Sequence, residues 1–361
     1  MAEKAEELFY LDDDGARQDA EIHETILARN RVDEKIMAPI RDRHRDAYLA
    51  QQQAKARGVR WLRIKQQAQR RIWNEADHPR EPAGSEEGGQ FAGGAGDLTS
   101  ASALREDEET ATPDEIIDRV PGAREQIADV RAKLKQAVPT SAPVSKGGHK
   151  RDNGSWTPER AAVHRDVVSQ IMTPEAMAAA RPAQGEQPVL HILGGRGGSG
   201  KSWYTGPDGT IDKSKSLYLN NDDVKERLPE YQGWNAAVLH EESSYVGGVM
   251  ETYARDNKMN VIIDATLKDG LTTAKRIEAF KAAGYRIEGH YMYTSPAKAA
   301  ERALGRFVRG MEKNGKGRFV PPEYSLGSTT NEQSFDRHRD DMDFWEIYDN
   351  DGDAPKLHAK K

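Results

Sequence analysis

Short apolar runs alternate with longer stretches of helical character through the second half of the sequence. Five runs are short enough for buried strands, and they lie at residues 189–193, 217–219, 261–263, 287–293 and 345–348. The stretches between them predict helices at residues 238–255, 271–283 and 296–311. This order predicts an α/β fold, in which a parallel sheet is flanked by helices and ligands bind at the carboxyl ends of the strands.

A helix start is marked just ahead of this region. Thr157 can cap a helix whose first residue is Pro158, and Glu159 lies in its first turn. Apolar residues then recur at a spacing of four up to Ile171, so the helix needs a partner surface, and we expect it to pack on the sheet. The compact domain is therefore expected to span residues 156–361.

The first 155 residues carry fewer apolar positions. Residues 1–75 have a helix-forming composition with a thin apolar stripe, which predicts a charged helical extension. Residues 76–112 are rich in glycine and proline and predict a linker, whereas residues 113–155 predict a short helical segment, broken at Pro121-Gly122, and a second linker. A mostly helical, partly disordered N-terminal extension is thus expected before the folded domain.

Composition agrees with this division and excludes several classes of function. Charged residues make up 31% of the 361 residues and hydrophobic residues 36%, so part of the chain is expected to stay outside a core. The absence of cysteine excludes disulfides, thiolate catalysis and cysteine zinc sites, and the net charge of −6 argues against a protein that coats nucleic acid. With no apolar run of membrane-spanning length and an acidic first segment, a soluble, cytoplasmic protein without a membrane partner is expected.

The first apolar run leads directly into a glycine-rich turn that ends in Gly-Lys-Ser. This turn fits the phosphate-binding P-loop pattern G-x-x-x-x-G-K-[ST], and its residues are Gly195, Arg196, Gly197, Gly198, Ser199, Gly200, Lys201 and Ser202. Glycines let backbone N–H groups surround a phosphate, the lysine adds positive charge for the β- and γ-phosphates, and the Ser202 hydroxyl can hold Mg²⁺. Because Gly206-Pro207 follows closely, only about one helical turn is predicted after Ser202.

Carboxylates follow the next two predicted strands. Asp222 can orient and deprotonate an attacking hydroxyl, or it can simply cap the following helix. Asp264 ends its apolar run in the manner of a Walker B strand and can bind Mg²⁺ or contact the substrate. Glu242, at the start of the helix between them, can hold a substrate hydroxyl or cap that helix.

Basic residues gather in the last predicted helix and the glycine-rich loop that follows it. They are Arg302, Arg306, Arg309, Lys313, Lys316 and Arg318. Beside a P-loop, mobile arginines can stabilise the charge that develops on a transferring phosphoryl group. Without the P-loop, the same run would indicate a solvated basic face.

Taken together, these segments resemble the zeta toxin kinases, from roughly Trp156 to the C-terminus. The corresponding motifs read Asn220-Asn-Asp-Asp-Val-Lys225, Asp264-Ala-Thr-Leu-Lys268 and Arg318-Phe-Val-Pro321, with Arg306 ahead of the last. The resemblance implies that Asp222 is the general base, that Lys201 and Ser202 bind phosphate and Mg²⁺, and that Arg306 and Arg318 clamp the transition state. Implied substrate contacts are Asp264, which can also be a metal ligand, Thr266, Lys225 and Glu242, with Glu251 as a rival for the last.

Known zeta toxins phosphorylate the 3′-hydroxyl of UDP-N-acetylsugars, but this sequence departs from their motifs on the substrate side. Lysine replaces arginine at positions 225 and 268, Asp264 replaces glutamate and Asn220 replaces an acid. We expect a kinase that uses Mg²⁺ with ATP or GTP, phosphorylates a nucleotide sugar or a related metabolite, and acts as a toxin. An antitoxin protein and a phage particle are the candidate macromolecular partners.

Two alternatives remain open. The first is a kinase of another acceptor carried by a phage or mobile element, since the segment from His78 to Phe91 resembles a short stretch of phage head-morphogenesis proteins. The second is a structural or interaction protein with a degenerate nucleotide-binding domain. The joint presence of Asp222, Lys201 and the two arginines favours an enzyme, because a degenerate copy should have lost at least one of them.

Overall fold

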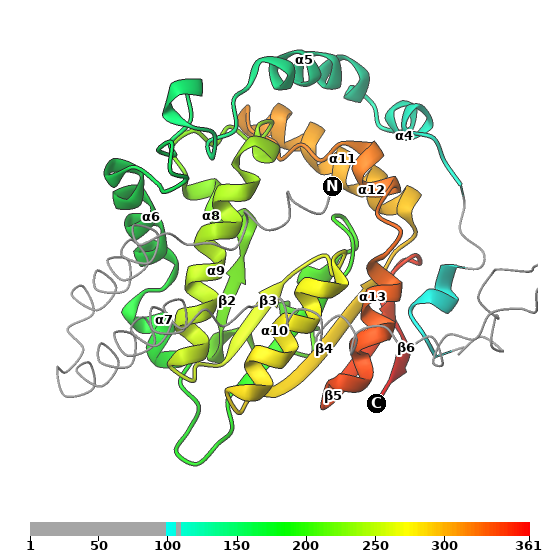
Figure 1. Cartoon of the computed structure of the whole chain (residues 1–361). Helices are drawn as coiled ribbons and strands as arrows, with labels where there is room; N and C mark the ends of the chain where they lie inside the picture. The colour runs from blue at the N-terminus through cyan, green and yellow to red at the C-terminus, as the bar shows by residue number, and fades with distance from the viewer. Residues whose placement is uncertain (1–98, 106–109) are drawn as a thin grey trace, which may run out of the picture. The chain divides into compact units, whose positions relative to one another are not determined.

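Six strands form one sheet in the order β2-β3-β1-β4-β5-β6 (Figure 1). The computed structural model describes residues 99–105 and 110–361. The strands are β1 (Val189–Gly194), β2 (Leu217–Asn220), β3 (Val261–Asp264), β4 (Arg286–Tyr293), β5 (Phe344–Asp349) and β6 (Lys356–Lys360). The first five are parallel, and β6 runs antiparallel to β5. The predicted α/β class and five predicted strands are confirmed, whereas β6 lacks an apolar run and was not predicted.

The strand register brings polar residues to one edge of the sheet. Leu193 on β1 pairs with Asp264 at the end of β3, and Asp264 in turn pairs with Asn220 at the end of β2. Carboxyl ends of parallel strands lie at the same edge, so the start of the P-loop meets these side chains there. The central strand is firmly fixed, because Leu190, Ile192 and Leu193 are wholly buried between the flanking layers.

Alternate strand residues enter two different cores. Leu190 and Ile192 belong to the larger core, which includes residues of α9 (His240–Asp256), α10 (Gly270–Ala282) and α13 (Asn331–His338). Figure 1 shows α10 and α13 side by side over this face. Leu193 belongs to the smaller core, which is completed by Tyr204 and Ile211 from the segment after the P-loop.

The segment after the P-loop folds into short turns. It contains the 3₁₀ turns η6 (Lys201–Thr205) and η7 (Lys213–Lys215). Pro207 and its neighbouring glycines end the first turn because proline cannot continue a helix and glycine favours other conformations. The prediction of a single helical turn after Ser202 is confirmed.

Threonine–proline steps set the starts of three helices. Thr112, Thr157 and Thr173 each accept a hydrogen bond from the backbone of the first turn, and proline follows at the first helical position. These helices are α4 (Pro113–Arg119), α6 (Pro158–Ile171) and α7 (Pro174–Ala179). The predicted cap at Thr157 is confirmed, as is the break at Pro121-Gly122, beyond which α5 runs from Ala123 to Gln136.

Residues before Trp156 also build the core. Ile116 on α4 and Ile127 on α5 are buried with Leu304 and Phe307 of α11 (Pro296–Asn314). In Figure 1, α4 and α5 lie along α11 and α12 (Pro322–Leu326). Compact packing therefore begins well before residue 156, because this pair of helices covers the outer apolar face of α11.

The remaining described elements are all short. They are α8 (Asn221–Arg227), η4 (Ser102–Arg105), η5 (Val144–Lys146), η8 (Ala236–Leu239) and η9 (Arg339–Asp341). The predicted charged extension at residues 1–75 and most of the linker at residues 76–112 lie outside the described residues. Among the helices that are described, none combines the length and the apolar character needed to cross a membrane.

Replacing Ile127 tests whether α5 is part of the cooperative core. Ile127→Ala should lower the free energy of unfolding by roughly 2–5 kcal/mol, because it leaves a cavity against α11. Lys135→Ala on the exposed side of the same helix is the control and should stay within about 0.5 kcal/mol of the parent. Chemical denaturation followed by tryptophan fluorescence measures both, and an unchanged main transition for Ile127→Ala would mean that α5 unfolds separately.

Candidate active site

The phosphate-binding loop is shaped by close backbone contacts. Gly195 and Gly198 have positive φ angles of 134° and 97°, which side chains rarely adopt. A Cβ atom on Gly195 would lie 2.4 Å from the carbonyl oxygen of Met292 on β4. On Gly198 it would lie 2.2 Å from the carbonyl oxygen of Ala299 on α11. The loop therefore packs directly against these two elements, at positions that accept only glycine.

Two strand ends hold the centre of the loop by hydrogen bonds. The carbonyl oxygen of Ser199 accepts from Asn350 Nδ2 at 2.7 Å and from Thr294 Oγ1 at 3.1 Å. Thr294 directly follows β4 and Asn350 directly follows β5. The same asparagine contacts Gly200, where an added Cβ would lie 2.4 Å from its Nδ2 atom. Residues from distant parts of the sequence thus fix the loop backbone.

The lysine of the P-loop lies over the loop itself. Lys201 Nζ donates to the carbonyl oxygens of Gly195 at 2.7 Å and Arg196 at 3.1 Å, and it lies 3.6 Å from Asp264 Oδ1. Only 11% of its side chain is exposed. Burial lowers the pKa of its ammonium group, and Asp264 opposes that shift. The lysine is therefore confined where the backbone of the loop would surround a phosphate.

Two arginines lie within electrostatic range of this lysine. Arg318 and Arg306 both lower the pKa of Lys201 further, as neighbouring positive charges do. Arg318 contacts the carboxylate of Asp222. Arg306 has an exposed side chain on α11, and no residue of the described chain forms an ion pair with it. Three positive groups from separate elements thus converge on one region, as an anion such as a triphosphate requires.

The residues expected to bind Mg²⁺ offer suitable oxygen atoms. The Ser202 side chain is exposed at the start of η6, and within the described chain its hydroxyl forms no hydrogen bond. Asp264 accepts a hydrogen bond from Tyr218 at 2.9 Å and lies 3.5 Å from Asn220 Nδ2. A hydroxyl and a carboxylate beside a phosphate cradle fit the preference of Mg²⁺ for hard oxygen ligands.

Asp222 lies in the first turn of α8 and does not cap it. The cap is Asn220, whose side-chain oxygen accepts from the backbone N–H of Asp222 at 2.9 Å, so the capping alternative for Asp222 is wrong. The Asp222 carboxylate instead contacts Arg318 and lies 3.1 Å from Lys225 Nζ. It is thus directed towards the cationic region and is held between two positive charges.

Lys225 and Thr266 are two further residues that the sequence predicts to contact the substrate. Lys225 is buried, and its burial lowers the pKa of its amine to about 8. Thr266 is half-buried in the loop after β3, and its carbonyl oxygen accepts a hydrogen bond from Asn331 of α13. Lys225 is thus paired with Asp222, and Thr266 lies two residues after Asp264 in the chain.

Arg196 has a different role from the other P-loop residues. Its guanidinium group forms two contacts with the carboxylate of Glu332 on α13 and donates to the carbonyl oxygen of Ser328 at 3.1 Å. Both charged side chains are almost wholly buried, with exposures of 1% and 0%. Only the backbone of Arg196 is thus available to a phosphate, and its side chain anchors the loop.

Glu242, a predicted substrate contact, is paired with other side chains of the protein in this structure. Its side chain is wholly buried and is bound by the guanidinium group of Arg160 and, at 2.6 Å, by His164 Nε2, both on α6. Burial alone would raise the pKa of Glu242, but the hydrogen bonds from His164 and Arg160 lower it to about 2. Its oxygens are thus engaged by two side chains of α6, and the rival Glu251 is paired with Arg276.

Sequence reasoning missed Tyr218, Glu332 and Asn350. Tyr218 could have been found from the alternation of side chains along a strand. It lies two residues before Asn220 on β2, so the two side chains share one face of the sheet. Glu332 and Asn350 come from segments more than 130 residues beyond the loop, as the separations in their contacts show. No local pattern marks them.

Residues 175–360, just over half of the chain, match the protein-family model described as zeta toxin. No curated protein matches the sequence. Among solved structures, the chain is similar to the AvrRxo1-ORF1:AvrRxo1-ORF2 complex with ATP, with 18% identity and a TM-score of 0.46 over 57% of this chain and 68% of that chain. It is also similar to the PezAT chromosomal toxin–antitoxin system of Streptococcus pneumoniae, with 16% identity and a TM-score of 0.44 over 57% of this chain and 81% of that chain.

Two adjacent glycines test the packing of the loop. Gly198→Ala should destabilise the nucleotide-free protein by about 1–3 kcal/mol or more, because the new Cβ meets the backbone of Ala299 and the φ angle is unfavourable. Gly197→Ala is the matched control, since no atom lies within 4 Å of its Cβ position, and it should leave stability within about 1 kcal/mol. Thermal unfolding measures both, and equal effects would contradict the proposed contact.

Proposed function

Because the chain belongs to the zeta toxin family, whose members are kinases, we propose that it is a toxin that acts by phosphoryl transfer. The proposed reaction moves the γ-phosphate of ATP or GTP to a hydroxyl group of a nucleotide sugar or a related metabolite. One observation carries this proposal: Lys201, Arg306 and Arg318 converge on a P-loop whose edge also holds the carboxylate of Asp222. A degenerate nucleotide-binding domain would not be expected to keep all four.

The positive groups have distinct tasks in the proposed reaction. Backbone N–H groups of the loop bind the phosphates, and Lys201 exchanges its contact with the Gly195 carbonyl for the β- and γ-phosphate oxygens. Arg306 and Arg318 stabilise the charge that develops on the transferring group. Lys201 is the least exposed of the side chains expected to bind phosphate, so its charge is the least screened by water.

Mg²⁺ fits the site through Ser202 and Asp264. These residues would hold the ion beside the loop, and when bound the ion neutralises charge on the β- and γ-phosphates. Tyr218 donates to one Asp264 oxygen, which orients the carboxylate. Because Lys201 lies 3.6 Å from the other oxygen, the lysine and Asp264 act on the same phosphate region.

Asp222 is the proposed general base. It accepts the proton of the acceptor hydroxyl while that oxygen attacks the γ-phosphate. In the nucleotide-free protein its carboxylate is held by Arg318 and Lys225. When Arg318 turns to the γ-phosphate, one charge leaves Asp222, and the carboxylate becomes available to the acceptor.

The acceptor is expected to lie between Asp222 and the loop after β3. Thr266 and Lys225 border this region and are proposed to contact it, whereas Glu242 is held elsewhere. The family resemblance favours a nucleotide sugar, and a different hydroxyl acceptor is the alternative. As a toxin the protein would need a neutralising partner, for which an antitoxin protein is proposed.

A phosphoryl-transfer assay with labelled nucleotide tests the proposed reaction and identifies the acceptor. The full-length protein should transfer label from γ-labelled ATP or GTP to at least one member of a panel of nucleotide sugars and related nucleotides in the presence of Mg²⁺. Lys201→Ala should abolish this transfer and leave the melting temperature within a few degrees of the parent, because the lysine contacts only loop carbonyls and Asp264. Transfer that survives in the variant would exclude the P-loop assignment.

The role of Asp222 is tested by the change to asparagine. Asp222→Asn should lower the turnover rate by roughly 10²- to 10⁴-fold with nucleotide affinity near the parent value, because an amide cannot accept the proton. Asp223→Asn, in the same helical turn, is the control and should be mild. Steady-state kinetics and nucleotide titration separate the two effects, and a harmless Asp222→Asn variant would sink the general-base assignment.

A further inference from the structure

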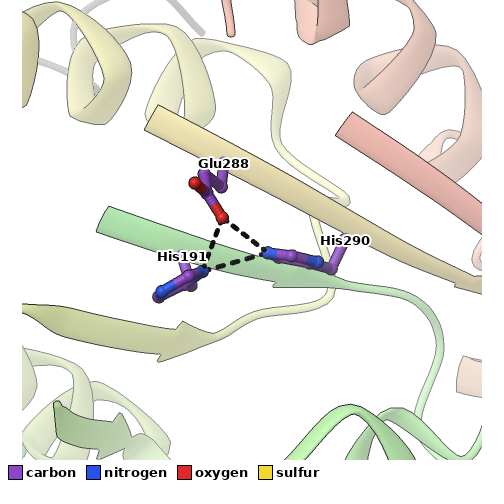
Figure 2. A group of neighbouring side chains, drawn as sticks. All are labelled: His191, Glu288 and His290. Carbon is purple, nitrogen blue, oxygen red and sulfur yellow. Dashed lines mark hydrogen bonds and ion pairs between the residues drawn. The ribbon is translucent and has the colours of Figure 1, made fainter. Parts of the chain in front are cut away.

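Three potential metal ligands meet on the face of the sheet that carries the smaller core. His191 lies on β1 and pairs in register with Glu288 on β4, and His290 follows two residues later on the same face of β4. Figure 2 shows the three side chains pointing towards one another from the two strands. Their potential ligand atoms all lie within 4.8 Å of one another. This cluster has no part in the proposed kinase mechanism.

The distances within the cluster suit a small tetrahedral ion. His191 Nδ1 lies 3.1 Å from His290 Nε2 and 3.3 Å from Glu288 Oε2, and the last two atoms are 4.0 Å apart. Ligand atoms about 2.1 Å from a tetrahedral zinc ion lie roughly 3.4 Å from each other. Only the contact between Glu288 and His290 needs to shorten appreciably.

A fourth residue orients one of the histidines. Nδ1 of His290 lies 2.7 Å from Glu346 Oε1 on β5, and Thr210 donates to the same oxygen at 2.7 Å. A carboxylate can only accept, so Nδ1 of His290 carries the proton. The lone pair of Nε2 then faces His191 and Glu288. A carboxylate that fixes the tautomer of a histidine in this way is the usual outer partner of a zinc-binding imidazole.

We propose that His191 Nδ1, Glu288 Oε2 and His290 Nε2 bind one Zn²⁺ ion, with Glu346 as the outer carboxylate and a water molecule in the fourth position. Without a metal, the proton on Nδ1 of His191 can bridge to Glu288 or to His290. The ion replaces this proton, which moves to Nε2 of His191 or to solvent. Charge is balanced in the bound state by the two carboxylates.

The position of the cluster allows an ion to enter and gives the ion a structural effect. The side chains of His191 and Glu288 are 16% and 15% exposed, whereas that of His290 is 2% exposed. The ion would join β1 to β4, which are the strand that leads into the P-loop and the strand against which Gly195 packs. Zinc binding should therefore stabilise the base of the nucleotide site without contacting it.

Zinc titration of the full-length protein, free of nucleotide and Mg²⁺, tests the site. Competition with a chromophoric chelator should reveal one Zn²⁺ per chain that is lost in His191→Gln and in Glu288→Gln. Glu346→Gln should weaken binding by roughly 10- to 100-fold, because it removes the outer carboxylate. Co²⁺ in place of Zn²⁺ should give the visible absorption of a tetrahedral site in the parent but not in His191→Gln or Glu288→Gln.

His358→Gln, on the edge strand β6 of the same sheet, is the matched control and should bind zinc like the parent. His191 and Glu288 are both partly exposed, so each variant should fold, and melting curves without metal check this. Equal zinc binding by the parent and both ligand variants, or none by the parent, would overturn the proposal. The outcome does not depend on kinase activity, so it separates this inference from the proposed function.

Discussion

The buried ion pair between Arg196 and Glu332 joins the phosphate-binding loop to the rest of the fold. Both side chains are removed from water, and Tyr291 of β4 donates to the same carboxylate at 2.6 Å. Loss of one partner from such a pair costs about 3–5 kcal/mol, because it leaves an uncompensated buried charge. The side chain of Arg196 thus points into the protein, while the backbone of the loop stays free to bind phosphate. Close contacts at Gly195 and Gly198 then fix the path of that backbone.

The truncated turn after the loop shapes the two faces of the sheet differently. Long helices cover the face of the larger core, whereas the segment 201–216 covers the other with short turns around Tyr204 and Ile211. Polar residues can lie on a largely buried face of a sheet if they pair with one another. His191, Glu288 and His290 do so there, beside the apolar Leu193 and Met292.

Local signals account for the features that the sequence predicts well. The strands and the start of α6 follow from apolar runs and from the Thr157-Pro158 step, and the loop follows from its spacing of glycines and lysine. Contacts between distant segments explain what the sequence does not predict. Glu242 gains its buried partners from α6, about 80 residues away, and α4 and α5 gain theirs from α11. The zinc ligands are brought together only by the parallel register of β1 and β4.

The pairing of charges without nucleotide bears on when the proposed base becomes available. Lys201 is held by loop carbonyls and Asp264, and Arg318 is held by Asp222. Binding of a triphosphate is therefore an exchange of partners, and the protein does not have to keep unpaired charges in a buried site. On the proposed mechanism, the same exchange releases the base. Asp222 gains freedom to act only when Arg318 has moved to the phosphate, so proton acceptance is tied to the presence of the group to be transferred.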